Sequence, residues 1–225
     1  MSPVLAILPV MPKLPAPRNA LETSWRAARG FRQLELRGLI PYASERGVVL
    51  IPGVERSIQG RHVLLLNFSD RTETVSTFDD LARLRQRERG LVIAPHPFFP
   101  ALMCLRGLLD RHRDLFDGVE YNAMFTKHVN FNRAAERWAA LRGKTLVGNG
   151  DVHRLHQLGT TYSVVDAIPA ADAICAAIAE GRVRVERTPL GWYDVARTLG
   201  PLLFGDLLPK RKVPPREPRA AGRAW

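Results

Sequence analysis

Short apolar runs alternate with longer amphipathic runs from Gly47 onward. Short β-branched or leucine-rich runs bounded by glycine are typical of strands buried on both faces. Apolar positions three and four residues apart, with acids early, bases late and a glycine after them, are typical of helices. Because the two kinds of run alternate without a repeat of fixed length, the pattern predicts an α/β fold built from βα units.

The predicted elements follow from this pattern. The expected strands cover residues 48–55, 62–68, 91–97, 118–123 and 182–188, residues 144–153 are expected to form a strand with its C-terminal loop, and residues 160–163 also have a strand-like pattern. The expected helices cover residues 77–89, with Thr77 as N-cap, and residues 101–116, 131–142 and 170–180. Gly90, Gly143 and Gly181 follow three of these helices and are expected to end them.

Composition divides the chain into three parts. Residues 1–46 are rich in proline and show little core pattern, so an irregular segment is expected there. Residues 47–200 carry the predicted α/β domain, and 225 residues with 46% hydrophobic content suffice for one sizeable core. Residues 201–225 are expected to form a basic, disordered tail.

The net charge of +11 favours anionic partners such as phosphate esters or nucleic acid. Residues 208–225 hold six basic side chains against one acidic, or +5, which leaves +6 for the rest of the chain. The tail can contact phosphate backbones without sequence preference. It lacks interleaved aromatic residues apart from Trp225, so a solubilising or loosely anchoring role is expected first.

The cysteines and the apolar segments favour a cytoplasmic location. Cys104 and Cys175 lie in apolar segments without CxxC spacing, which indicates buried thiols in a reducing compartment. No apolar run approaches the roughly 20 residues that cross a bilayer, and the opening residues lack the features of a signal peptide. No membrane partner is therefore expected.

Polar residues with metal-ligand chemistry follow several predicted strands. They are Glu55 in IPGVE, His96 in APHP, Glu120 in GVEYN, and Asp151 with His153 in NGDVH. Reactive side chains gather at the C-terminal ends of strands in α/β sheets and barrels. Each residue alone is more often a turn or solvated residue, but together imidazoles and carboxylates bind Zn, Mn or Fe well.

The stretches IPGVE, IAPHP, GVEYN and GNGDVHRLHQLGTTYS resemble motifs of the PHP family, named for polymerase and histidinol phosphatase. The resemblance runs from about residue 47 to about residue 192 and is closest to small bacterial phosphoesterases of this family. It implies a distorted (β/α)7 barrel and two or three divalent ions that activate water against a phosphate ester.

The resemblance also implies a ligand set. Glu55 would bridge ions, while His96, Asp151 and His153 would be terminal ligands. A further family ligand has no clear counterpart, and Glu120 and His128 are the two candidates. Beside these, Arg154 and His156 are candidate phosphate contacts, with a surface-loop position as the alternative for His156.

The sequence departs from the family at its start. The family's HxH and TDH motifs are not found, and the first histidine is His62. A barrel incomplete at the N-terminus and fewer bound ions are therefore expected, unless a misassigned start codon or a frameshift has replaced these motifs. His62 itself is interpreted as structural, His112 as a solvated surface residue, and Trp138 as core packing.

Two functions follow from these observations. The first is a metal-dependent phosphoesterase acting on a small phosphate ester or a nucleic-acid end, impaired by the missing ligands. The alternative is a non-catalytic PHP-fold remnant that binds RNA or a protein partner. The absence of Walker, GxGxxG and GxSxG motifs disfavours the corresponding nucleotide-binding and hydrolase classes.

Overall fold

The computed structural model describes residues 40–45, 47–68, 70–151 and 159–197. The predicted tail at residues 201–225 lies outside them, as does nearly all of the predicted N-terminal segment at residues 1–46. In the described part of the chain, no helix is both long enough and apolar enough to cross a membrane.

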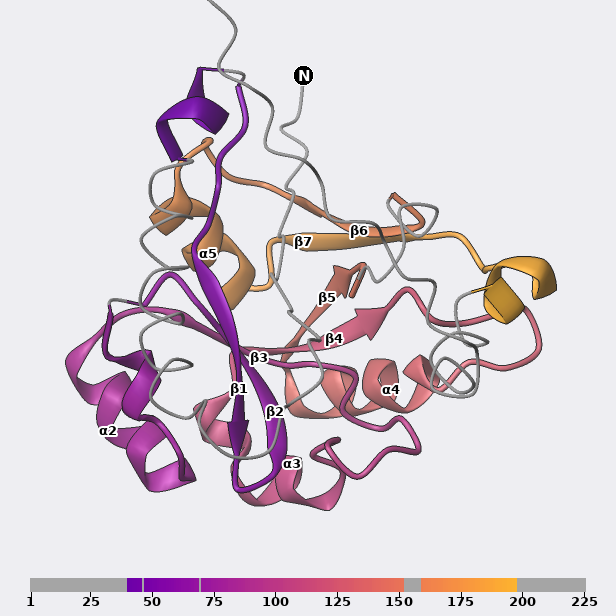
Figure 1. Ribbon diagram of the computed structural model, residues 1–225, viewed down its shortest axis with the longest axis horizontal. Helices are drawn as coiled ribbons and strands as arrows, with labels where there is room; N and C mark the ends of the chain where they lie inside the picture. The colour runs from indigo at the N-terminus through magenta and orange to yellow at the C-terminus, as the bar shows by residue number, and fades with distance from the viewer. Residues whose placement is uncertain (1–39, 46, 69, 152–158, 198–225) are drawn as a thin grey trace, which may run out of the picture.

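The centre of the fold is a mixed five-stranded sheet in the order β1-β2-β3-β4-β5 (Figure 1). Its strands are β1 (Gly53–Ile58), β2 (Arg61–Leu66), β3 (Leu91–Ala94), β4 (Gly118–Asn122) and β5 (Thr145–Asn149). β1, β2 and β3 pair antiparallel, whereas β3, β4 and β5 pair parallel. The sheet therefore combines a hairpin with a parallel α/β half.

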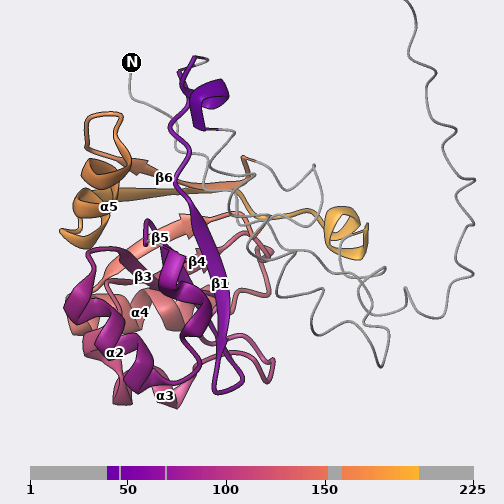
Figure 2. The same cartoon turned by 60° about the vertical axis from the view of Figure 1, so that its left-hand side comes forward.

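Helices and a second sheet cover the two faces of the first sheet. The helices α2 (Phe78–Arg87), α3 (Gly107–Arg111) and α4 (Asn132–Arg142) lie on one face in both side views (Figures 1 and 2). Helix α5 (Ala171–Ala179) and the antiparallel pair β6 (Thr161–Val165) and β7 (Val183–Arg187) lie on the other. Residues 40–44 and 192–197 are also helical, and two short 3-10 turns cover Asp70–Thr74 and Arg113–Leu115.

Alternating side chains of the sheet supply two cores, as the two-residue period of a strand requires. Val63, Leu65 and Val92 pack toward the face that α4 covers, where Trp138 is nearly buried. Leu64, Leu66, Leu91 and Ile93 pack toward α5. The runs of β2 and β3 are thus apolar because both faces of these strands are buried.

The predicted helix ends at Thr77 and Gly143 are confirmed by their capping geometry, whereas α2 already ends at Arg87, before Gly90. Thr77 and Asp80 form a capping box at the start of α2, in which Asp80 N donates to Thr77 Oγ1 at 3.1 Å. Such a cap satisfies amide groups that have no partner within the helix. Gly143 ends α4 with a left-handed φ of 59°, a conformation that costs glycine little.

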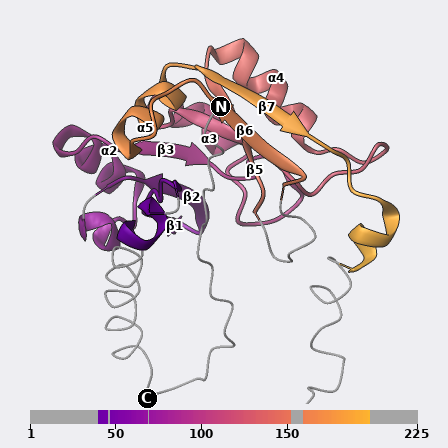
Figure 3. The ribbon, with the colours of Figure 1, turned by 90° about the horizontal axis from the view of Figure 1, so that it is seen from above.

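The second sheet packs across β5 at a glycine. Ser163 Oγ on β6 accepts from Gly148 N at 2.9 Å and donates to Gly148 O at 3.1 Å. A Cβ atom on Gly148 would lie 2.6 Å from Tyr162 O and 2.8 Å from Val185 Cγ1. Only a residue without a side chain lets β5, β6 and β7 approach this closely. Figure 3 shows β6 and β7 lying over β5 from above.

Three sequence-based expectations about elements were wrong. The first strand starts at Gly53, not Val48, because the segment before it ends in Pro52, which has no amide proton to donate. This strand and the next form a hairpin, closed by Gln59 and Gly60 with φ of 48° and 74°, so no βα unit separates them. The helix expected over residues 101–116 begins only after Arg106, whose φ of 48° is incompatible with an α-helix.

The α/β class is confirmed. The described strands form an open five-stranded sheet and a separate two-stranded sheet, and they do not close into a ring. β6 and β7 both contact β5, the last strand of the large sheet. The arrangement places the carboxyl ends of β3, β4 and β5 at one edge, where polar side chains gather.

Candidate metal centre

Glu55, His62 and His96 bring three potential ligand atoms within 4.8 Å of one another. Glu55 lies on β1, His62 near the start of β2, and His96 just after β3. His62 Nδ1 is 2.5 Å from Glu55 Oε1, and the ring centroids of His62 and His96 are 5.6 Å apart. Among the described residues, these three side chains form the group whose donor atoms lie close enough to hold one metal ion.

The hairpin geometry explains why His62 joins this group. Glu55 pairs with Leu64 and Ser57 pairs with His62, so Glu55 and His62 are diagonal neighbours on one face of the two strands. The sequence led us to interpret His62 as structural, and the structure places it beside Glu55 and His96. β2 runs antiparallel to β3, so its first residues lie at the edge where the parallel strands end.

Glu120 fixes the backbone at His96. Its Oε2 accepts from His96 N at 2.6 Å. His96 has a φ of 31°, which is unfavourable for a residue other than glycine and needs support from its surroundings. The carboxylate of Glu120 on β4 therefore holds the loop after β3 in a conformation that it would not adopt alone.

Asn122 connects two carboxylates on neighbouring strands. Its Nδ2 donates to Glu120 Oε2 at 3.2 Å and to Asp151 Oδ2 at 3.1 Å. Asn122 is itself positioned by its buried neighbour Asn132, whose Oδ1 accepts from Asn122 N at 2.9 Å and whose Nδ2 donates to Asn122 O at 2.8 Å. Asn122 was not among the residues expected from the sequence, although it ends the same GVEYN stretch as Glu120.

The environment favours a neutral imidazole at His96. Burial lowers the pKa of His96, while the charges of Asp151 and Glu55 act in the opposite direction. Cys104 Sγ lies 3.4 Å from His96 Nδ1, and burial raises the pKa of the Cys104 thiol. A thiol beside one ring nitrogen orients the ring, and a neutral imidazole is the form that binds metal ions.

The residues fit a divalent metal ion. The buried atom Glu120 Oε1 has no hydrogen-bond partner among the described residues. Polar atoms buried in this way are costly unless something else satisfies them. The oxygen and imidazole donors are those that Zn, Mn and Fe accept, and a cation would offset the adjacent carboxylates of Glu120 and Asp151.

The structure leaves some predicted site residues apart or undescribed. His128 lies in the loop after β4, with its ring stacked over Trp192 at 6.3 Å, and it is not part of the ligand group. His153, Arg154 and His156 lie outside the described residues. His112 is half-buried and stacked on Phe78 at 4.0 Å, so the expectation of a solvated surface residue was wrong.

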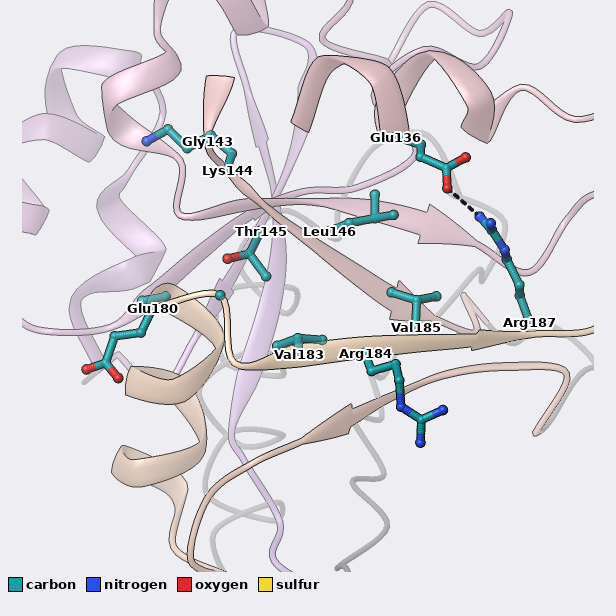
Figure 4. A pocket seen from close by; sticks show the side chains of 12 residues that line it. Glu136, Gly143, Lys144, Thr145, Leu146, Glu180, Val183, Arg184, Val185 and Arg187 are labelled. Atoms are coloured by element: carbon teal, nitrogen blue, oxygen red, sulfur yellow. Dashed lines mark hydrogen bonds and ion pairs between the residues drawn. The ribbon is translucent and has the colours of Figure 1, made fainter. Parts of the chain in front are cut away.

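A cavity of about 470 Å³ lies at the opposite end of β5, between α4 and β7 (Figure 4). Its charged side chains already have partners. Arg187 pairs with Glu136 at 2.9 Å, Lys144 Nζ donates to Phe116 O at 2.7 Å, and Glu180 pairs with Arg182 at 2.9 Å. Because these charges are compensated, the cavity is not the candidate active site.

Glu120 gives the centre a pH dependence that can be measured. Burial raises the pKa of Glu120 from 4.5 to about 8, and Asp151 adds to the rise. The folded protein therefore holds a proton that the unfolded chain releases, and this contribution to stability is present below pH 4.5 and lost as the pH rises through about 8. We expect the free energy of unfolding of the metal-free protein to fall over this interval.

Urea unfolding with a chelator present, at several pH values, measures this effect. Glu120→Gln carries no titrating proton and should flatten the pH dependence, whereas Glu180→Gln, at an exposed ion pair, should leave it unchanged. Identical pH slopes for Glu120→Gln and the wild type would contradict the assignment to Glu120.

The fold and the site together define an α/β protein with a candidate divalent-metal centre at the carboxyl edge of its parallel strands. In a comparison with family models, residues 129–183 match the PHP-associated family. The resemblance of the chain to PHP proteins is thereby confirmed, and the matched region covers α4, β5, β6 and α5. A search of curated proteins found no match.

Solved structures also resemble the chain, among them two from Bacteroides vulgatus and Pseudomonas syringae. One is a two-domain protein from Bacteroides vulgatus that contains a predicted PHP-like metal-dependent phosphoesterase, with 20% identity, a TM-score of 0.51, and coverage of 70% of this chain and 50% of that one. The other is PsfC from Pseudomonas syringae, with 20% identity, a TM-score of 0.49, and coverage of 72% and 68%. The chain spans half the length of the Bacteroides protein, and at this identity the likeness concerns the fold.

Proposed function

We propose that the protein is a divalent-metal-dependent phosphoesterase of PHP type. The observation that carries the proposal is the convergence of Glu55, His62 and His96 at one edge of the sheet, within 4.8 Å. The Glu120–Asn122–Asp151 network extends this edge with two further carboxylates. Clusters of imidazoles and carboxylates of this kind suit hydrolysis assisted by a metal ion.

Each residue has a distinct proposed role. Glu55, His62, His96 and Asp151 hold the metal, with Glu120 available as a further carboxylate and His153 as a further imidazole. Ions bound there would neutralise charge on a phosphate ester and activate water. Asn122 orients Asp151, and Glu120 supports the His96 loop. Arg154 and His156 are proposed to contact the phosphate.

The proposal extends to the barrel, the substrate, the location and the metal that the sequence led us to expect. The fold would be a distorted PHP-type barrel that is incomplete at the N-terminus, and the contacts of β6 and β7 with β5 support this. The substrate would be a small phosphate ester or a nucleic-acid end, and the protein would act in the cytoplasm with Mn, Zn or Fe. The basic residues 208–225 would add nonspecific contact with nucleic acid.

Metal content and hydrolysis test the proposal directly. The full chain is purified without chelator, dialysed against Mn, Zn or Fe in turn, and assayed by elemental analysis and with p-nitrophenyl phosphate. We expect bound metal and metal-dependent hydrolysis, both removed by a chelator and restored by the ion. His96→Ala should weaken metal binding at least about tenfold, because it deletes a ligand.

His128→Ala is the matched control. This histidine lies outside the ligand group, so its removal should leave metal content unchanged. Absence of bound metal under all three ions would refute the proposal. Metal bound without any turnover of phosphate esters would favour the non-catalytic alternative, which RNA binding with a steep salt dependence would then support.

A further inference from the structure

A second cavity, of about 310 Å³, lies beside β4 between the loop that follows it, the start of α4 and the end of β7. Tyr121 and Phe125 contribute to its lining, and their rings meet edge to face at 5.3 Å. Lys127, Arg133 and Arg187 bring positive charge to the lining from three different segments. Ligand sites of small molecules have volumes of about 300 Å³ and above.

The lining has excess positive charge. Glu136 is its acidic residue, so three basic groups against one acid leave +2. Glu136 pairs with Arg187 at 2.9 Å, as Figure 4 shows. Lys127 and Arg133 are exposed, and neither has an ion-pair partner in the part of the chain that the structure describes. Two cationic groups at the cavity are therefore available to an anion.

Hydrogen bonds fix the segment that carries these cations. Asn130 Nδ2 donates to Tyr121 Oη at 2.8 Å, and Asn130 Oδ1 accepts from Asn132 N at 3.0 Å. Thr126 Oγ1 accepts from Val129 N at 2.9 Å. The guanidinium of Arg187 lies 4.6 Å from the centroid of the Tyr121 ring. The loop backbone that carries Lys127 and the guanidinium of Arg187 are thus positioned before binding, which lowers the conformational entropy lost when an anion arrives.

We propose that this cavity binds a phosphate-bearing anion at a site separate from the candidate metal centre. Guanidinium groups match the oxygens of phosphate with paired N–H donors, and a lysine adds a point charge. A phosphate dianion also balances the +2 charge of the lining. The cavity volume suits a phosphate group with a small organic substituent.

The strand geometry separates this site from the metal centre. Tyr121 stands between Glu120 and Asn122 on β4, and successive side chains of a strand point to opposite faces. Glu120 and Asn122 face Asp151, so the cavity beside Tyr121 lies on the other side of the strand. An anion can therefore occupy it without contacting the candidate metal ligands.

Titration of the full chain with inorganic phosphate tests the proposal. Binding is followed through backbone amide shifts of residues 124–130 by NMR. The double variant Lys127→Ala/Arg133→Ala should raise the Kd for phosphate at least about tenfold, because two charge-assisted contacts are lost. Arg137→Ala is the matched control, since Arg137 is exposed on the same helix outside the cavity lining and should leave the Kd unchanged.

The variant Glu55→Gln/His62→Ala separates the two sites. It alters the metal centre, and phosphate should still shift residues 124–130 in it with an unchanged Kd. The proposal is overturned if wild-type protein shows no phosphate-dependent shifts there, or if Lys127→Ala/Arg133→Ala binds phosphate as the wild type does. Binding of a single-stranded oligonucleotide without any binding of inorganic phosphate would also overturn it, in favour of a nucleic-acid surface.

Discussion

The double variant Glu55→Gln/His62→Ala is expected to weaken metal binding by about a hundredfold or more. Glu55 and His62 each contribute one atom to the group of potential ligands that lies within 4.8 Å, so both side chains would reach the same ion. Glutamine preserves the shape of Glu55 but removes its charge, and alanine removes the imidazole. Affinity for first-row metals depends on the number and charge of such ligands. The loss of one carboxylate and one imidazole therefore leaves too few ligands for tight binding.

Competition against a chelating dye measures this loss, with each single variant beside the double. Because both residues would bind one ion, the single effects should not add up to that of the double variant. The control is Glu180→Gln/His112→Ala, which removes the same two residue types away from the ligand group. Wild-type metal affinity in Glu55→Gln/His62→Ala would exclude these residues as ligands.

Gly148→Ala is expected to lower the free energy of unfolding by about 2 to 3 kcal/mol, the cost of forcing extra volume into a packed interior. The new Cβ would lie 2.6 Å from Tyr162 O, a backbone atom that cannot move without shifting β6. It would also meet Val185 on β7 at 2.8 Å. The substitution therefore disturbs the packing of the second sheet on β5.

Urea unfolding followed by circular dichroism measures this change. Gly107→Ala is the control, because a Cβ at Gly107 meets no atom within 4 Å and alanine is favoured over glycine in a helix. Gly107→Ala should leave stability unchanged or raise it slightly. Equal stability of Gly148→Ala and the wild type would show that β6 and β7 do not pack tightly on β5.

The sequence predicted those elements whose local signals and tertiary surroundings agree. Helices α2, α4 and α5 have clear amphipathic patterns, and the capping residue Thr77 and the terminal Gly143 mark two of their ends. The helix expected over residues 101–116 was too long because the apolar spacing continues across Arg106. The left-handed backbone of Arg106 depends on tertiary contacts, so the spacing does not reveal it.

The sequence predicted those residues of the candidate centre that belong to the parallel strands or to the loops after them. His96 and Asp151 follow the carboxyl ends of β3 and β5, Glu120 lies two residues before the end of β4, and such ends meet at one edge. His62 was missed because it begins a strand instead of ending one. Recognising the Gln59–Gly60 turn as a hairpin would have placed His62 opposite Ser57 and beside Glu55.

The amide of Asn122 donates hydrogen bonds to carboxylates on two adjacent strands, Glu120 on its own strand and Asp151 after the next. A slip of one residue between β4 and β5 would turn the side chains of one strand to the opposite face and separate this pair. Chains with such a slip would lack the complete centre. Under the proposed function, the amount of metal that a refolded preparation binds would therefore measure the fraction of molecules in which β4 and β5 are correctly aligned.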